Sequence, residues 1–295
     1  MRDDTPSRTA QWVAAARGLG MLLPANVRLA EDPYGVAFSS ARIAKLIGDN
    51  NPRPLASIPG LKTWIVYMQV RTRVLDDAVR TFVAGGGRQV VLLGAGFDCR
   101  ALRLPELTEA QVFEVDHPAT QGHKLMTLEK LGVTSPAQYV TWDFETRPLD
   151  ELPEALADAG HDPTLPTLTI WEGVTMYLTE AAIDASIRAI SDYSAPGSQL
   201  AMTYFAKNRL RRPSLATRVV QAAVARLGEP WTWGWSPDEL PDYLEERGWE
   251  LVRDVATADA ARALLPANLA SAIKAATDSR VALAVIPESI AIAQR

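Results

Sequence analysis

The sequence predicts an α/β protein with a mostly parallel sheet. The run Val90–Leu93 is apolar at every position and leads into a Gly-x-Gly turn. Consecutive apolar residues are typical of a strand that is buried on both faces of a parallel sheet. Further apolar strands follow, with helical segments between them. At 295 residues the chain can bury one sizeable core, so we expect one large α/β unit with additions.

The elements are expected in a definite order. Helical segments occupy residues 7–50, and a long helix runs from about Leu61 to Val83, where glycines 85–87 terminate it. A further helix is expected from Glu180 to Tyr193. Strands are predicted near residues 89–93, 111–115, 138–142, 167–171, 198–205, 249–254 and 281–286.

We divide the chain into four parts. They are an N-terminal helical cap region (1–84), an α/β core that binds the ligand (85–206), a lid or substrate insertion (207–240) and the C-terminal part of the core (241–295). The insertion is expected to contain a helix from Leu215 to Leu227.

The glycine turn indicates a nucleotide-like ligand. Gly94 and Gly96 permit a tight turn and let the backbone approach a ligand where a Cβ would clash. Open α/β sheets bind such ligands outside the carboxyl ends of their strands. A dinucleotide fingerprint needs a third glycine where this chain has Cys99, whereas an S-adenosylmethionine turn needs only the pair. A plain sharp turn is the further alternative, so the later strand ends have to decide.

Two later strands end in acids that suit an adenosine. Asp116 lies about twenty residues after the glycines, where a carboxylate can accept both ribose hydroxyls. Its alternative role is the N-cap of a helix that begins near Pro118. Asp143 can accept from the exocyclic amine of an adenine while Phe144 covers a ring face. The alternative for this pair is an ordinary turn after a strand.

A fourth strand ends in Glu172 beside Gly173. A charge at the end of a buried strand is costly unless it is paired. The ammonium group of a methionine moiety would pair it, and so would an arginine of the protein.

Four such strand ends in succession are more specific than any one of them. With these residues the chain resembles the class I S-adenosylmethionine-dependent methyltransferases. Within that class it resembles the leucine carboxyl methyltransferase family, which includes many actinobacterial proteins and polyketide O-methyltransferases. The similarity extends from about Ser7 to the last strand and departs from the family at Cys99, where threonine is usual. The residues that carry it are Asp32-Pro33-Tyr34, 70–73, 93–100, 113–116 and 171–174.

The resemblance implies a Rossmann-like sheet with an antiparallel last strand, and S-adenosylmethionine as the cofactor. It also implies that an arginine of the long helix binds the carboxylate of the cofactor. We favour Arg71 over Arg73, because positions two apart face different sides of a helix and a guanidinium suits a bidentate contact. Arg8 is a further candidate for the cofactor or the acceptor. The expected cofactor-binding residues are Arg71, Gly94, Ala95, Gly96, Asp98, Asp116, His117, Asp143, Phe144 and Glu172.

The expected reaction is O-methylation of a small molecule, secondary metabolites included. A carboxylate is favoured over a phenol or an enol, because no lysine or histidine base is evident in the loops at the strand ends. Tyr177 and Tyr204 are candidates to position the acceptor, and either could be a core residue instead. Trp233, with Trp231 and Trp235, could line an apolar acceptor pocket or pack the insertion onto the body.

Two other classes of protein stay in view. An NAD(P)-dependent oxidoreductase should carry a Tyr-x-x-x-Lys or a similar proton donor, but Ala181 lies four residues after Tyr177 and Asn208 four after Tyr204. A non-catalytic protein that binds S-adenosylmethionine would share the same turn and acids.

Composition excludes several other functions. The net charge of −5 supplies no basic field for nucleic acid. A single cysteine forms no disulfide within the chain and agrees with a reducing cytoplasm. Three scattered histidines predict no metal site. The N-terminus begins without the apolar segment of a signal peptide, so none is expected, and no run of 18 apolar residues predicts a membrane helix. The expected partner is a small-molecule acceptor, and the oligomeric state is left open, a homodimer included.

Overall fold

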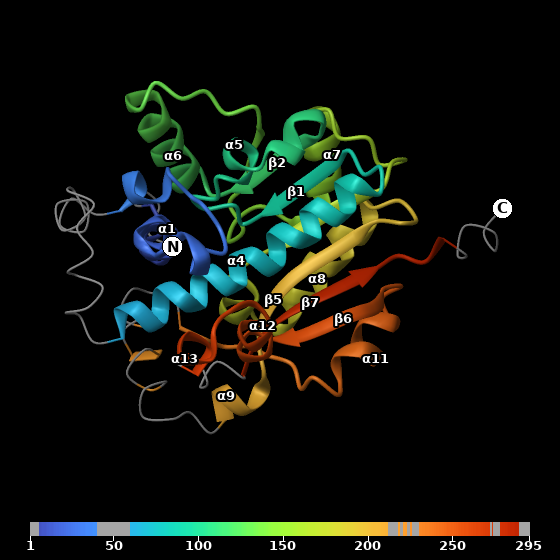
Figure 1. Cartoon of the computed structure of the whole chain (residues 1–295). Helices are drawn as coiled ribbons and strands as arrows, with labels where there is room; N and C mark the ends of the chain where they lie inside the picture. The colour runs from blue at the N-terminus through green and yellow to red at the C-terminus, as the bar shows by residue number, and fades with distance from the viewer. Residues whose placement is uncertain are drawn as a thin grey trace.

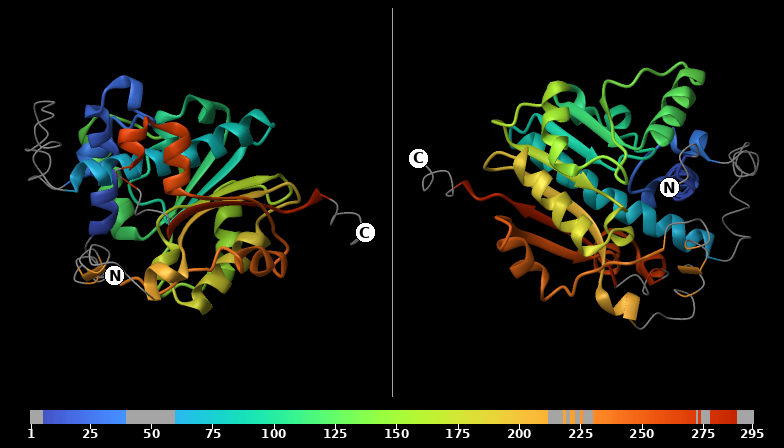
Figure 2. Two further views of the ribbon diagram at one scale, coloured as in Figure 1. Left: turned by 60° about the horizontal axis from the view of Figure 1, so that its bottom comes forward. Right: turned by 180° about the vertical axis from the view of Figure 1, so that it is seen from behind.

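The computed structural model of the protein is a seven-stranded sheet with helices on both faces (Figures 1 and 2). It describes residues 6–39, 60–211, 230–271 and 278–288, together with positions 218, 221, 222, 225 and 273. The predicted helix from Leu215 to Leu227 lies almost wholly outside these residues.

The strand order across the sheet is β3-β2-β1-β4-β5-β7-β6. Parallel pairs join β3 to β2, β2 to β1, β1 to β4 and β4 to β5, and β7 runs antiparallel to both of its neighbours. This confirms the predicted mostly parallel sheet with an antiparallel last strand. The strands are β1 Gln89–Leu93, β2 Gln111–Asp116, β3 Gln138–Thr141, β4 Thr167–Trp171, β5 Gln199–Phe205, β6 Glu250–Ala256 and β7 Ser279–Val285. Each agrees with its predicted position to within about two residues.

Helices cover the sheet in two layers. One apolar cluster joins a face of the sheet to α4, α12 and α13, and a second joins the other face to α7, α8 and α11. The views from the front and from behind show these layers on opposite sides of the strands (Figures 1 and 2). The α-helices are α1 Arg8–Leu19, α4 Leu61–Ala84, α5 Arg100–Arg103, α6 Pro118–Lys130, α7 Leu152–Asp158, α8 Glu180–Asp192, α9 Lys207–Arg211, α11 Leu240–Glu245, α12 Thr257–Leu264 and α13 Ala267–Ala270. The 3₁₀ turns are Gly20–Leu22, Ala25–Val27, Gly35–Phe38, Pro105–Glu109, Leu149–Glu151 and Thr175–Tyr177.

The long helix α4 ends where the glycines predict. Its C-cap is Gly85, and Gly86 follows with φ 97°, a left-handed conformation that glycine adopts without strain. A Cβ on Gly87 would lie 2.2 Å from the ring of Phe82, so the turn must stay small there to reach β1. The prediction of this helix and of its stop is confirmed.

The tryptophans after β5 pack onto the body of the protein. Trp235 is 2% exposed and contacts Tyr204 and Tyr243 edge to face. Trp233 meets Trp235 edge to face at 6.0 Å, and Trp231 meets Phe205 at 4.6 Å. The packing alternative therefore holds for this segment. The four-part division of the chain stays a prediction.

Candidate functional site

A cavity of about 220 Å³ opens at the carboxyl ends of β1, β2 and β4. Its floor and walls come from the glycine turn after β1, from residues that follow β2, β3 and β4, and from one face each of α1 and α4. All ten residues expected to bind the cofactor are among the residues that line it. The strand ends that looked separate in the sequence thus meet in one place.

The glycine turn forms the wall nearest β2. The backbone N–H groups of Gly94 and Ala95 both donate to the carbonyl of Val115, at 2.9 and 3.1 Å. Gly94 has φ 70°, and a Cβ there would lie 2.6 Å from Cγ2 of Val174. Glycine is therefore required twice over, by backbone conformation and by the approach of the neighbouring loop.

Asp116 is tied to that turn from the end of β2. Its carboxylate accepts from the backbone N–H of Gly96 and from that of His117, the latter at 2.6 Å. Burial raises the pKa of Asp116 and outweighs these two donors, which act in the opposite direction. The N-cap alternative for Asp116 is wrong, because His117 caps α6 by accepting from the N–H of Ala119 at Nδ1, at 3.2 Å.

Asp143 and Phe144 lie at the far end of the cavity, after β3. The Asp143 carboxylate accepts from the N–H of Glu145 at 2.9 Å and from the hydroxyl of Thr146 at 2.7 Å. These contacts form an Asx-type turn, and the hydroxyl of Thr146 is the main cause that lowers the pKa of Asp143. Both readings of this pair are therefore compatible, since the residue builds its own turn and still lines the cavity.

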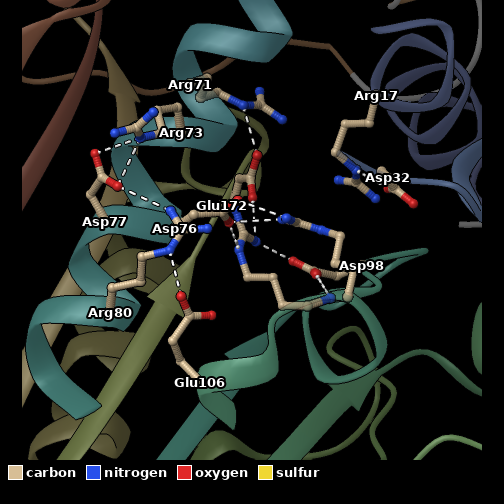
Figure 3. Close-up of polar contacts among 12 residues, drawn as sticks. Arg17, Asp32, Arg71, Arg73, Asp76, Asp77, Arg80, Asp98, Glu106 and Glu172 are labelled. Carbon is tan, nitrogen blue, oxygen red and sulfur yellow. Dashed lines mark hydrogen bonds and ion pairs between the residues drawn. The ribbon is translucent and has the colours of Figure 1, made fainter. Parts of the chain in front are cut away.

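Glu172 is paired with arginines of the protein (Figure 3). Its Oε1 accepts from Nε of Arg71 at 2.8 Å, and its Oε2 accepts from Nη1 of Arg100 at 2.8 Å. Burial alone would raise the pKa of Glu172, but the two arginines hold it well below its usual range. The arginine alternative for Glu172 holds, and its carboxylate stays ionised beside the cavity.

Arg71 rather than Arg73 reaches the cavity. Arg71 is 5% exposed, and among the described residues only Glu172 bonds to its guanidinium, through Nε. Arg73 lies on the outer side of α4, where it pairs with Asp77 at 2.8 Å (Figure 3). Arg8 is exposed and is not part of the cavity wall.

Sequence reasoning missed a second cavity arginine, Arg17 of α1. Its Nε pairs with Asp32 at 3.0 Å, and its Nη2 donates to the carbonyl of Phe97 at 2.5 Å. No local pattern in the sequence indicated this contact, because the need of Asp32 for a partner follows from its burial, at 1% exposed, in the folded chain.

A set of buried charges below the cavity was also missed. Arg100 is fully buried and bonds to Asp76 through Nε at 2.9 Å. Arg103 bonds to both oxygens of the same carboxylate at 2.7 Å. Asp98, which lines the cavity, accepts from both the backbone N–H and the side chain of Arg100.

The three residues predicted to position the acceptor lie in different places relative to the cavity. Tyr177 lines the cavity. Tyr204 is fully buried in the core, where its hydroxyl donates to Asp254 at 2.8 Å, and it lies outside the cavity wall. Trp233 belongs to the packed segment after β5 and lies outside the cavity wall. Its indole was predicted as a pocket candidate because the sequence cannot distinguish a pocket aromatic from a packed one.

The cavity fits S-adenosylmethionine. Gly94 and Gly96 line the cavity without side chains, and the protein leaves no space for one at Gly94, where a Cβ would lie 2.6 Å from Cγ2 of Val174. The two ends of the cavity differ in chemistry, with the acids Asp116 and Asp143 and the ring of Phe144 at one end, and guanidinium groups together with Asp98 and Glu172 at the other. Among the described residues, no cluster of side chains suited to a metal ion occurs, and no helix is long and apolar enough to cross a membrane.

Comparison with known proteins also indicates an S-adenosylmethionine-dependent methyltransferase. A family profile described as "Leucine carboxyl methyltransferase" matches residues 10–191. A Mycobacterium sp. (strain JLS) protein named "Putative S-adenosyl-L-methionine-dependent methyltransferase" is 34% identical over 259 residues, which cover 82% of each chain. A Frankia alni protein of the same description is 32% identical over 244 residues and also covers 82% of each chain.

Solved structures share the fold. A DUF574 family protein from Streptomyces avermitilis has a TM-score of 0.58 at 21% identity, over 88% of this chain and 97% of that one. A putative methyltransferase from Thermobifida fusca has a TM-score of 0.55 at 20% identity, over 92% of this chain and 97% of that one.

Proposed function

Because the chain belongs to the leucine carboxyl methyltransferase family and uses S-adenosylmethionine, we propose that it methylates an oxygen atom of a small-molecule acceptor. A carboxylate is the preferred acceptor over a phenol or an enol. The observation that carries the proposal is the meeting of the four strand ends in one cavity.

The adenosine half of the cofactor is assigned to the end of the cavity formed by β2 and β3. Asp116 would accept from the ribose hydroxyls, with His117 beside it, and Asp143 would accept from the adenine amine while Phe144 covers the ring. The carboxylate of Asp116 is already held in place by the N–H groups of Gly96 and His117. Its orientation therefore need not be fixed by the ligand.

The methionine half is assigned to the opposite end. Arg71 has its terminal nitrogens available for a carboxylate, and Arg17 lies in the same wall. Asp98 and Glu172 supply negative charge for an ammonium group, and the backbone of the turn 94–96 borders the sulfur side. The charges of the cavity thus match both ends of an amino-acid group.

Methyl transfer requires few catalytic groups around the acceptor. S-adenosylmethionine, when bound, supplies a methyl group already activated by its sulfonium. The protein has to hold an acceptor oxygen in line, which by proximity alone lowers the barrier by several kcal/mol. Tyr177 lies in the wall and is the candidate to position that oxygen.

The absence of an evident base favours a carboxylate. His117 is the one histidine among the described residues of the cavity wall, and its Nδ1 is occupied by the cap of α6. A carboxylate is ionised at neutral pH and needs no proton removed, whereas a phenol does.

A transfer assay tests the proposal. The protein is incubated with S-adenosylmethionine labelled in its methyl group and with panels of carboxylic acids and phenols, and the products are identified by mass spectrometry. We expect a methyl ester that mild base hydrolyses. Methyl groups found only on nitrogen, carbon or sulfur would refute O-methylation, and cofactor binding without transfer to any panel would favour a non-catalytic binder.

A further inference from the structure

Arg100 lies directly beneath the cavity without forming part of its wall. It is the first residue of α5 and is fully buried. Its neighbours Asp98 and Glu172 do line the cavity, and so does Arg71 beyond Glu172. The side chain is therefore one layer below the residues that would contact the methionine moiety.

Arg100 joins three elements that come from distant parts of the chain. Its Nη1 bonds to Asp98 in the turn after β1 and to Glu172 at the end of β4, the latter at 2.8 Å. Its Nε bonds to Asp76 of α4 at 2.9 Å, and Asp76 is held in turn by Arg103. Figure 3 shows three of these partners, Asp76, Asp98 and Glu172, close to one another.

The charges around this guanidinium are balanced. Four guanidinium groups and four carboxylates form the buried set: Arg17, Arg71, Arg100, Arg103, Asp32, Asp76, Asp98 and Glu172. Asp98 and Glu172 accept from the same nitrogen of Arg100, so the two carboxylates lie close together. Without that cation, two like charges would share a buried space, and their repulsion would raise the pKa of at least one of the two carboxyl groups.

We propose that Arg100 is a positioning residue for the methionine moiety, which from below the cavity fixes Asp98 and Glu172, and through Glu172 also Arg71, in one arrangement. The proposal rests on the cofactor assignment above. It gives Arg100 two separate effects. The guanidinium geometry orients the two carboxylates, and its charge keeps both of them ionised for an ammonium group.

Calorimetric titration with S-adenosylhomocysteine separates these effects. Titrations at pH 7 in two buffers of different ionisation heat report both the affinity and the protons released on binding. The wild type is expected to bind with almost no proton release. Arg100→Gln is expected to bind roughly 10- to 100-fold more weakly, the scale of lost hydrogen bonds to charged groups. It should also release a proton, since the ammonium group favours the ionised carboxylate.

Two more variants complete the design. Arg100→Lys keeps the charge but not the planar fork, so it should bind weakly without releasing a proton. Arg80→Gln is the matched control, because Arg80 lies on α4 in a surface pair with Glu106 (Figure 3), and its affinity should equal that of the wild type.

The outcomes are distinct. Wild-type affinity in a folded Arg100→Gln protein would overturn the proposal. So would weak binding by Arg100→Gln without proton release, or proton release by Arg100→Lys equal to that of Arg100→Gln. If Arg100→Gln does not fold, Asp76→Ala tests the same point, since it removes the oxygen that accepts from Nε of Arg100 while all cations remain. It should weaken binding roughly 3- to 10-fold, and unchanged affinity would overturn the proposal. A wild type that does not bind S-adenosylhomocysteine would instead refute the cofactor assignment.

Discussion

The two ends of the cavity hold their carboxylates by different means. At the end formed by β2 and β3, Asp116 and Asp143 accept from backbone N–H groups and a threonine hydroxyl close in the sequence or across one strand. At the other end, the partners that Glu172 has within the described part of the chain are arginines that lie 72 and 101 residues away. Acids of the first kind can lose their charge at small cost to the fold, whereas Glu172 is part of a balanced set of buried ions.

The largest expected effect is a loss of stability at the end of the cavity where arginines hold Glu172. Glu172→Gln removes the negative charge between Arg71 and Arg100 and leaves two buried guanidinium groups without it. Removing one partner of a buried ion pair costs about 3–5 kcal/mol. Urea unfolding should show a loss of free energy of unfolding on this scale. A loss below about 1 kcal/mol would mean that Glu172 behaves as a surface ion, contrary to its burial.

Asp116→Ala tests the other end of the cavity, where backbone N–H groups hold the carboxylate. The substitution removes a carboxylate proposed to accept from the ribose, so the affinity for S-adenosylhomocysteine should fall by about 1–3 kcal/mol. The free energy of unfolding should fall by less than that of Glu172→Gln, because no buried cation loses its partner. Calorimetry and urea unfolding of the same preparation give both numbers. Unchanged affinity in the folded variant would move the ribose contact to another residue.

This contrast also explains what the sequence could predict. Asp116, Asp143 and Glu172 each follow an apolar strand, so their meeting at one edge follows from the parallel sheet alone. The stop of α4 followed from its glycines. Arg17 and Arg100 became part of the site only through contacts made by folding, as with Arg17 and Phe97, 80 residues apart. A local pattern carries no information about such partners.

The tryptophans after β5 show a second kind of feature that could not be predicted from the sequence. A cluster such as Trp231, Trp233 and Trp235 has the same composition whether it lines a pocket or packs on a core. Trp235 is fixed by the bridge to Ala206 and by the rings of Tyr204 and Tyr243. These contacts depend on the path of the chain after β5. Hydrophobic periodicity predicts strands and helices but not the path of such a segment.

The pH dependence of stability should differ between the two ends. The pKa of Glu172 is lower in the folded state than in the unfolded chain, so its stabilising contribution is present above about pH 4.5 and is lost as the pH falls below that value. Asp116 has a raised pKa, so its contribution has the opposite sign and is lost as the pH rises. The difference in free energy of unfolding between the wild type and Glu172→Gln should therefore shrink in acid, by up to about 1.4 kcal/mol per pH unit. The same comparison with Asp116→Asn should not shrink, and a parallel loss in both would contradict the contrast.

The smallest expected effect concerns Asp143. Asp143→Asn keeps an oxygen that can accept from Glu145 and Thr146, so the turn after β3 should persist and the free energy of unfolding should change little. The amide oxygen can still accept from an adenine amine, but a neutral acceptor is weaker than a carboxylate. The affinity for S-adenosylhomocysteine should therefore fall by only about 0.5–1.5 kcal/mol. Asp162→Asn is the matched control, since Asp162 forms the same kind of turn with Thr164 outside the cavity wall. If both variants bind alike, the adenine does not contact Asp143. A loss larger than that of Asp116→Ala would make this half-buried carboxylate the principal contact at its end of the cavity.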